Sequence, residues 1–359
     1  MKKLLAFVIG ITMILCFAGC GEQEQSAEAP ATDSAEVALL VDGDIDDGGF
    51  NEVTWQSIQN FCSGNDITCA YYIPKGTKDE EIKETVEEAI EKDGKLIIFA
   101  GSTFETAVFD LQKEHKDINF YLIDGVPHDK DNTYELADNS IGVLFAEQEA
   151  GYLAGYAIVK DGYRNLGFMG GEDLPSVKRY GYGFLQGISA AAAEQGIEKD
   201  ITIRYDYAGT FSANEEVQKE AMEWYADGTE VIFSCGGGII KSIVKASKKE
   251  GGKIIGVDVD QSELASTVVT SAKKGIDSAI EDVLKGYNRD NFVGNNVFNY
   301  TASNGGVGLE ITNARFKSFD KAQYDEIFNQ IKEGSIQIKK DTEVDDIEDL
   351  VDDNIKIIK

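Results

Sequence analysis

The sequence contains few of the residue types that most often carry metal or hydrolytic chemistry. Only two histidines, His115 and His128, occur in 359 residues, which excludes a histidine-rich metal site. There is no CxxC pair, no cluster of cysteine with histidine, and no G-x-S-x-G motif. The sequence therefore offers no evident catalytic triad and no cysteine–histidine metal centre.

Basic residues are also scarce. The chain has 34 Lys and Arg against 64 Asp and Glu, which gives a formal net charge of −30 at pH 7. Such a surface repels nucleic acid and anionic lipid, so neither is expected as a partner of the folded part. A neutral or cationic small ligand is easier to reconcile with this charge. A simple gain in solubility is the alternative explanation of the acidity.

The first twenty residues are not expected to belong to the fold. A lysine pair precedes the apolar run LLAFVIGITMILCF, which is short for a membrane span, and F-A-G-C ends at Cys20. This pattern resembles a lipoprotein signal, with Phe17 where Leu is usual. Residues 1–19 are therefore predicted to be a signal peptide, and residues 20–35 a flexible tether from lipid-modified Cys20. The protein is expected on the extracytoplasmic face of a bacterial cell membrane; a simple secretory signal is the alternative.

Three cysteines follow Cys20. Cys62 and Cys69 could form a disulfide in an oxidising compartment, and two free thiols are equally compatible with their spacing.

Apolar, β-branched runs alternate with amphipathic stretches along the rest of the chain. The runs fall at 36–41, 67–73, 95–100, 118–124, 165–170, 201–207, 230–235 and 253–259. Helical patterns occupy 77–94, 146–162, 176–196 and 214–228. This rhythm predicts an α/β protein with two doubly wound parallel-sheet lobes. Ligands of such sheets bind beyond the carboxyl ends of the strands.

The stretch VDGDIDDGGFNE, residues 41–52, follows the first predicted strand and concentrates negative charge there. A calcium loop would use Asp42, Asp44 and Asp46, but it also needs Gly at Asp47 and Glu at Val53. The calcium interpretation is therefore disfavoured.

A phosphotransferase of the haloacid dehalogenase type also places D-x-D after a strand. That family has Thr or Val where this chain has Asp46, and a second D-x-D, Asp258 and Asp260, follows another strand. Aspartate at strand ends is thus a general feature of this chain. A metal-dependent, lipid-anchored phosphotransferase or hydrolase remains the alternative from another class.

A neutral polyhydroxylated ligand fits the acidic loop better. Ionised carboxylates only accept hydrogen bonds, and sugar hydroxyls supply donors. Phe50 and Phe211 stand at strand ends in different lobes and could stack on a flat base. Asn51 can donate and accept at the edge of that base. The alternative for Phe50 is an apolar anchor of the following helix.

Seven segments, taken in order, resemble one known family. They are IDDGGFNEVTWQSIQNF, FYLIDG (120–125), IGVLFAEQEAGYLAGYAI (141–158), LGFMGGEDLPSVKRYGYGFLQG (166–187), YAGTFSANEEVQKEA (207–221), IIGVDVDQ (254–261) and TSAKKGID (270–277). They are similar to the motifs of the basic membrane protein (PnrA-like) family of bacterial substrate-binding lipoproteins. The resemblance implies a type I periplasmic-binding fold. It also implies a monomer without cofactor or catalytic activity, which delivers purine nucleosides (adenosine, guanosine or inosine) to an ABC import permease.

The resemblance also implies the ligand-binding residues. In the family pattern the base lies between two Phe side chains, and carboxylates and one Lys bind the ribose. The corresponding residues here are Asp42, Asp46, Phe50, Asn51, Asp124, Phe211, Gly237, Asp258 and Lys274. The loop at 42–47 is one residue shorter than the family pattern, SCGGG replaces a usual A-G-x-T/S-G, and Ala213 replaces a usual Asp. These differences leave the fold unchanged and the identity of the ligand open, with a sugar or modified nucleoside as the alternative.

The family fold also implies three crossings between the lobes. The first lobe is expected to comprise residues 36–142 and about 259–295. The second is expected to comprise residues 143–258 and about 296–359. A surface protein without a transport role is a further possibility that the sequence leaves open.

Overall fold

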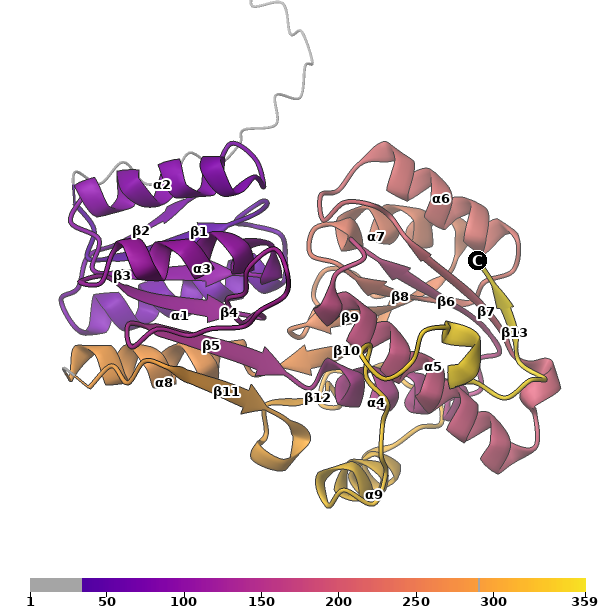
Figure 1. Ribbon diagram of the computed structural model, residues 1–359. Coiled ribbons are helices and arrows are strands. Elements are labelled where there is room, and N and C mark those ends of the chain that lie inside the picture. The colour runs from indigo at the N-terminus through magenta and orange to yellow at the C-terminus, as the bar shows by residue number, and fades with distance from the viewer. Residues whose placement is uncertain (1–33, 290) are drawn as a thin grey trace, which may run out of the picture.

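The computed structural model describes residues 34–289 and 291–359, which form two α/β lobes side by side (Figure 1). The predicted signal peptide and lipid-modified Cys20 lie outside the described residues, as does the tether up to residue 33. Across the described ranges, no helix has the length and apolar character needed to cross a membrane.

The first lobe is built on a six-stranded parallel sheet with the order β11-β5-β4-β3-β1-β2. Its strands are β1 (Val37–Val41), β2 (Cys69–Tyr72), β3 (Leu96–Ala100), β4 (Asn119–Ile123), β5 (Ser140–Phe145) and β11 (Asn296–Tyr300). Its helices are α1 (Phe50–Gly64), α2 (Asp79–Glu91), α3 (Glu105–Glu114) and α8 (Ile276–Asn288).

The side chains of β1 alternate between two apolar layers, because successive residues of a strand point to opposite faces. Val37, Leu39 and Val41 pack in the layer of α1 and α8, whereas Ala38 and Leu40 pack in the layer of α2 and α3. All five are fully buried, as expected for a parallel sheet covered on both faces. Cys62 and Cys69 are free thiols in this lobe.

The second lobe is built on a seven-stranded sheet with the order β12-β10-β9-β8-β6-β7-β13. Its strands are β6 (Asn165–Gly170), β7 (Thr202–Tyr207), β8 (Val231–Cys235), β9 (Lys253–Asp258), β10 (Val268–Lys274), β12 (Val307–Leu309) and β13 (Lys356–Ile358). Its helices are α4 (Glu147–Lys160), α5 (Pro175–Gln195), α6 (Glu215–Ala226), α7 (Ile239–Glu250) and α9 (Lys321–Lys332). Short 3₁₀ turns occur at Ser102–Phe104, Glu198–Asp200, Ala302–Asn304 and Ile347–Leu350. Only β12 runs antiparallel to its neighbour among these strands.

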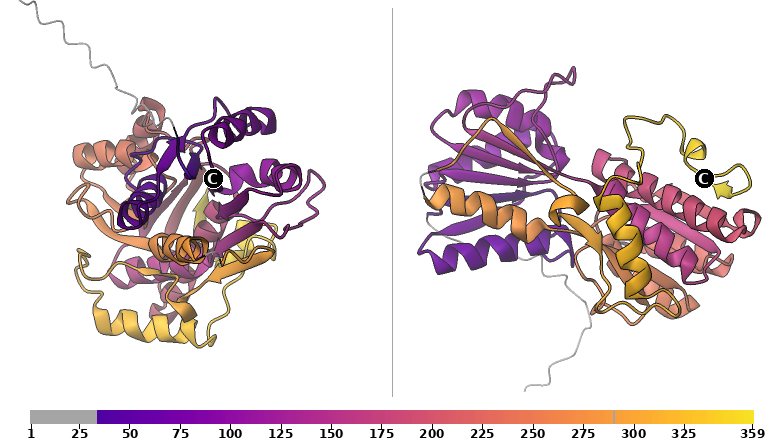
Figure 2. Two further views of the ribbon diagram at one scale, coloured as in Figure 1. Left: turned by 90° about the vertical axis from the view of Figure 1, so that its left-hand side faces the viewer. Right: turned by 90° about the horizontal axis from the view of Figure 1, so that it is seen from below.

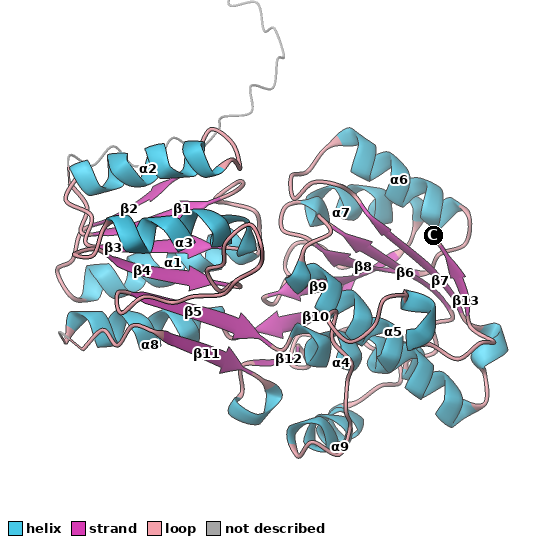
Figure 3. Ribbon diagram, viewed as in Figure 1, coloured by secondary structure: helices cyan, strands magenta, loops and turns pink. Residues whose placement is uncertain are grey.

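Helices α4 and α5 approach each other through glycines. A Cβ at Gly151 would lie 2.1 Å from the carbonyl oxygen of Tyr180, and one at Gly155 would lie 2.2 Å from that of Phe184. Gly183 and Gly187 on α5 face α4 in the same way. The glycine spacing in 141–158 and 166–187 therefore serves the contact between the two helices that cover one face of the second sheet (Figure 3).

The sheets assign two strands differently from the sequence-based boundaries. Strand β10 was expected in the first lobe, but it pairs with β9 in the second sheet. Strand β11 was expected in the second lobe, but it pairs with β5 and forms the edge of the first sheet. The chain thus crosses after Phe145, after Lys274 and after Tyr300 (Figure 2). The crossings come later than expected because β5, β10 and β11 each pair with the sheet that the chain is about to leave.

The three crossing segments are bonded to one another. The Ala146 amide donates to the Tyr300 carbonyl at 2.8 Å, and the Gly275 amide donates to the Gly306 carbonyl at 2.9 Å. The Glu149 carboxylate accepts from the Ala302 amide at 2.6 Å. These bonds hold the crossings together as one hinge on the side of the molecule where β5 and β10 meet (Figure 3).

Candidate ligand-binding site

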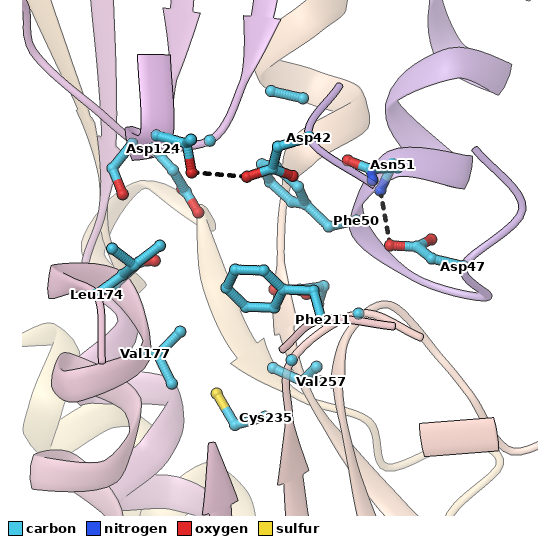
Figure 4. Close-up of a pocket in the computed structure, with 18 of the residues that line it drawn as sticks. Asp42, Asp47, Phe50, Asn51, Asp124, Leu174, Val177, Phe211, Cys235 and Val257 are labelled. Atoms are coloured by element: carbon cyan, nitrogen blue, oxygen red, sulfur yellow. Dashed lines mark hydrogen bonds between the residues drawn. The ribbon is translucent and has the colours of Figure 1, made fainter. Parts of the chain in front are cut away.

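A pocket lies between the lobes and is lined by the loops that follow strands of both sheets (Figure 4). Eight of the nine predicted ligand-binding residues line it: Asp42, Phe50, Asn51, Asp124, Phe211, Gly237, Asp258 and Lys274. These residues are up to 232 positions apart in the sequence, from 42 to 274, and the carboxyl ends of the strands bring them together. Asp46 is the exception.

The two predicted aromatic side chains enter the pocket from different lobes. Phe50 is the first residue of α1, and Phe211 lies in the loop between β7 and α6. Both are half-buried and face the same pocket (Figure 4). The pocket therefore has an aromatic surface on each side of the division between the lobes, as a flat ligand requires.

Asp47, not Asp46, supplies the second carboxylate of the acidic loop. The side chain of Asp46 is exposed, whereas Asp47 is 4% exposed and lines the pocket. The Asp47 carboxylate accepts from the amides of Gly49 (2.8 Å), Asn51 (3.1 Å) and Glu52 (3.2 Å). These amides belong to the start of α1, so the helix N-terminus turns Asp47 inward and leaves its neighbour outside. Burial nevertheless raises the pKa of Asp47 to about 6.

Asp42 is held by a hydroxyl of the neighbouring loop. The Thr103 hydroxyl donates to Asp42 Oδ2 at 2.7 Å. Burial raises the pKa of Asp42, and this hydrogen bond lowers it in part. Asp42 lines the pocket, and its role in binding a ligand stays a prediction.

Asp124 and Asp258 occupy equivalent positions in the two lobes. Each ends or follows a central strand, and each has a left-handed backbone, with φ of 65° and 67°. Aspartate tolerates this conformation better than most residues, and such strain concentrates at functional sites. Both side chains are buried in the pocket wall. Burial raises the pKa of Asp258 to about 6.

Lys274 is the single cationic residue among those that line this pocket. Its ammonium group forms an ion pair with Asp124 and lies 3.3 Å from Glu147 and 3.7 Å from Asp258. Although burial alone would lower it, these three carboxylates raise the pKa of Lys274 well above its ordinary value. The ammonium group also lies 5.2 Å from the ring centroid of Phe50. Lys274 is therefore charged and fixed between the lobes.

An ion pair behind the pocket, between Glu147 and Arg179, was not predicted from the sequence. Glu147 is fully buried at the first turn of α4, and Arg179 Nε donates to its carboxylate at 2.6 Å. Arg179 also lies 3.8 Å from Asp341 of the C-terminal segment. The Tyr180 hydroxyl donates to Asp258 at 3.3 Å. The signal that could have found Glu147 is its place in the F-x-E-x-E motif, directly after an apolar strand.

The pocket is suited to binding a neutral polar molecule. It offers flat apolar surfaces, hydrogen-bond acceptors and one amide. Asn51 Oδ1 and Asp124 Oδ1 are buried without a hydrogen-bond partner within the described part of the chain. Buried polar atoms are normally paired, so these two are available to a ligand. Among the described residues, no group of three or more His, Cys, Asp or Glu side chains is arranged to hold a metal ion.

Two α/β lobes joined by three crossings, with a pocket between them, define the type I periplasmic-binding fold. Solved structures with this fold superpose on the chain. A solute-binding protein of an ABC transporter system from Aeropyrum pernix matches with a TM-score of 0.75 and 18% identity, over 84% of this chain and 92% of that one. A sugar transporter structure from Clostridium phytofermentans matches with a TM-score of 0.56 and 16% identity, over 77% of this chain and 99% of that one. The predicted fold class is confirmed.

The chain belongs to the family of PnrA-like ABC transporter substrate-binding proteins, whose model matches residues 34–348. It is 26% identical to the ABC transporter nucleoside-binding protein BmpA of Lactococcus lactis, over 88% of this chain and 93% of that protein. It is 29% identical to basic membrane protein A1 of Borrelia garinii, over 89% of this chain and 90% of that protein. The resemblance identified in the sequence is therefore confirmed, and the family is one of binding proteins rather than enzymes.

Proposed function

We propose that this protein captures purine nucleosides in the pocket between its lobes and delivers them to an ABC import permease. The observation that carries the proposal is the meeting of Phe50 and Phe211, from opposite lobes, in one pocket with four carboxylates. The name of the Lactococcus lactis relative, a nucleoside-binding protein, supports the same ligand class.

Each part of a nucleoside has a suitable partner in the pocket. Phe50 and Phe211 stack on the two faces of the base, and stacking on an aromatic side chain contributes about 1–3 kcal/mol per base. Asn51 and Asp47 meet the polar edge of the base. Asp124, Asp258 and Lys274 bind the ribose hydroxyls, because carboxylates accept hydrogen bonds from hydroxyl groups and the ammonium group donates to their oxygens. No bond of the ligand is made or broken.

We place the protein outside the cytoplasm, held on the cell membrane by a lipid on Cys20. Substrate-binding proteins of ABC importers work on that side of the membrane, and the F-A-G-C sequence supports the lipid anchor. Mass spectrometry of the protein extracted from its native membrane tests this. A diacylglyceryl-modified Cys20 at the N-terminus supports the anchor, and an unmodified N-terminus contradicts it.

The binding proposal is tested by calorimetric titration of residues 36–359 with adenosine, guanosine, inosine, cytidine and ribose. We expect purine nucleosides to bind and ribose alone to fail, because the base supplies the stacking. The change Phe211→Ala should lower purine nucleoside affinity by about 5- to 150-fold, the equivalent of one stacked face.

The matched control is Phe298→Ala, since Phe298 is 44% exposed on β11, outside the pocket. It should leave the affinity unchanged. Ribose binding as tightly as a nucleoside, or equal effects of the two Phe changes, would contradict a base stacked between the lobes. In that case a sugar becomes the better ligand.

A further inference from the structure

The loop after β1 is held to the second lobe by side chains outside the pocket lining. Two donors of the second lobe, Gln261 and Lys241, reach backbone carbonyls of the loop at residues 42–49. Gln261 closes the G-V-D-x-D-Q motif, and Lys241 lies on the first turn of α7. Neither residue lines the pocket, so neither is placed to touch a ligand.

The amide of Gln261 is oriented by its own lobe. Gln261 Oε1 accepts a hydrogen bond from the Val257 amide at 2.8 Å. Because a backbone N–H can only donate, the oxygen of the Gln261 side chain, and not its nitrogen, must face Val257. The nitrogen then faces the other lobe, where Nε2 donates to the Gly48 carbonyl at 2.8 Å. The Gln261 backbone amide is fixed as well, by the Ser271 hydroxyl at 3.1 Å. Gln261 is 1% exposed, so water does not compete easily for these bonds.

Two glycines allow the loop to reach Gln261. Gly48 has a φ of 77°, which favours glycine, and its carbonyl is thereby turned toward the second lobe. A Cβ at Gly49 would lie 3.3 Å from Gln261 Nε2, tighter than an ordinary contact. The same loop carries Asp47 directly before these glycines and Phe50 directly after them. A bond to Gly48 therefore fixes two pocket side chains at once.

Lys241 reinforces this contact two residues earlier in the loop, at Asp46. Its ammonium group donates to the Asp46 carbonyl, which gives the short loop a second attachment to the other lobe. The exposed side chain of Asp46, unexpected from the sequence, agrees with this contact, because Lys241 binds the backbone carbonyl of Asp46 and not its carboxylate.

We propose that Gln261 and Lys241 are positioning residues that stabilise the closed form of the protein, binding the carbonyls of Gly48 and Asp46 across the division between the lobes. This inference rests on the proposed function, because its main test measures the release of a nucleoside. Both bonds span the two lobes, so they exist only when the lobes are together. Ligand enters before they form and leaves after they break.

The test measures association and dissociation rate constants of inosine by surface plasmon resonance on the full folded part, residues 36–359. The variant Gln261→Glu keeps the shape and the bond from Val257, but it sets a second acceptor against the Gly48 carbonyl. We expect dissociation about 10-fold faster, and about 3-fold faster for Lys241→Met, with association unchanged within about twofold. Controls are Lys245→Met, exposed on the same helix, and Gln218→Glu on α6, which adds the same charge.

An unchanged dissociation rate in Gln261→Glu, or equal changes in the controls, overturns the inference. A melting temperature lowered together with a slower association rate also overturns it, since that result indicates general damage. If the wild-type protein binds no nucleoside, the proposed function fails by itself. Small-angle X-ray scattering of the ligand-free protein then decides: a larger radius of gyration in Gln261→Glu than in Gln218→Glu supports the positioning role, and equal values overturn it.

Discussion

Asp124 of the first lobe forms a buried ion pair with Lys274 of the second lobe. Lys274 lies at the end of β10, where the chain crosses between the lobes, and Asp124 follows β4 in the other sheet. The pair therefore links the hinge to the pocket. Its surroundings lead to four predictions, and the packing of α4 on α5 leads to a fifth.

Removing the ammonium group should destabilise the folded protein strongly. Lys274→Met leaves Asp124, Glu147 and Asp258 buried without their shared cation, and breaking a buried ion pair on one side costs about 3–5 kcal/mol. Urea denaturation checks this. Lys273→Met is the control, since Lys273 is 40% exposed and its loss leaves only one carboxylate, that of Glu310, without its cation, so the expected loss is smaller. Equal losses in the two variants would contradict the assigned role.

Weakening the Glu147–Arg179 pair should lower the affinity for nucleosides that carry ribose hydroxyls. Glu147→Gln keeps a hydrogen-bond acceptor for Arg179 but removes one of the three charges that hold Lys274. We expect inosine affinity to fall about 10-fold, the equivalent of 1.4 kcal/mol, because the ammonium group is no longer held toward the ribose. Affinity for 2′,3′-dideoxyinosine, which lacks those hydroxyls, should change far less. A uniform loss for both ligands, measured by calorimetry, would indicate a structural role only.

Ligand affinity should fall as the pH is lowered through about 6. Burial raises the pKa of Asp47 and Asp258 to about 6, and the ionised carboxylate only accepts hydrogen bonds, whereas the protonated form presents an O–H donor to the ligand. Titrations at pH 7.5, 6.5 and 5.5 measure this effect. Affinity that is flat across this range would show that these carboxylates do not accept hydrogen bonds from the ligand.

The same pKa values act in the opposite direction on the stability of the ligand-free protein. Because the folded pKa of Asp258 lies above the ordinary value of 3.8, its contribution to stability is complete below pH 3.8 and is lost as the pH rises through about 6. Asp258→Asn should therefore be more stable relative to wild type at pH 7 than at pH 4. Denaturation of both proteins at the two pH values tests the sign.

A methyl group added to a glycine between α4 and α5 should destabilise the packing of the two helices. In Gly155→Ala the Cβ would lie 2.2 Å from the Phe184 carbonyl oxygen, so the helices must move apart. We expect a loss of about 1–3 kcal/mol in the free energy of unfolding, typical of an overfilled contact. The control is Gly64→Ala at the end of α1, where nothing lies within 4 Å of the added Cβ. Thermal unfolding of the two variants should separate them clearly.

Much of the fold follows from local pattern. The eight apolar runs all became strands, because β-branched residues bounded by polar turns fit only a buried parallel sheet here. Strands β5 and β10 were harder to recognise, since each runs into a crossing without an intervening turn. Sheet membership depends on pairing between distant segments, such as β11 with β5, which no local pattern encodes.

Some residues of the site also follow from local sequence rules, whereas others depend on the three-dimensional fold. The rule that ligands bind beyond strand ends placed Asp42, Asp124 and Asp258 around one pocket. The choice between Asp46 and Asp47 depended on where α1 begins, and one residue decides which side chain faces inward. Glu147 and Arg179 were missed because their partners are distant in sequence, and only folding shows that Arg179 and Lys274 share Glu147.

The excess of carboxylates over ammonium groups in the pocket also bears on which metabolites it admits. A phosphate on the ribose would bring further negative charge to Asp42, Asp47, Asp124 and Asp258, while Lys274 is already shared among carboxylates. Two like charges 4 Å apart repel by about 4 kcal/mol at a protein surface. Under the proposed function, this repulsion favours nucleosides over nucleotides, so a cell importing through the pocket would take up the dephosphorylated products of nucleic acid breakdown.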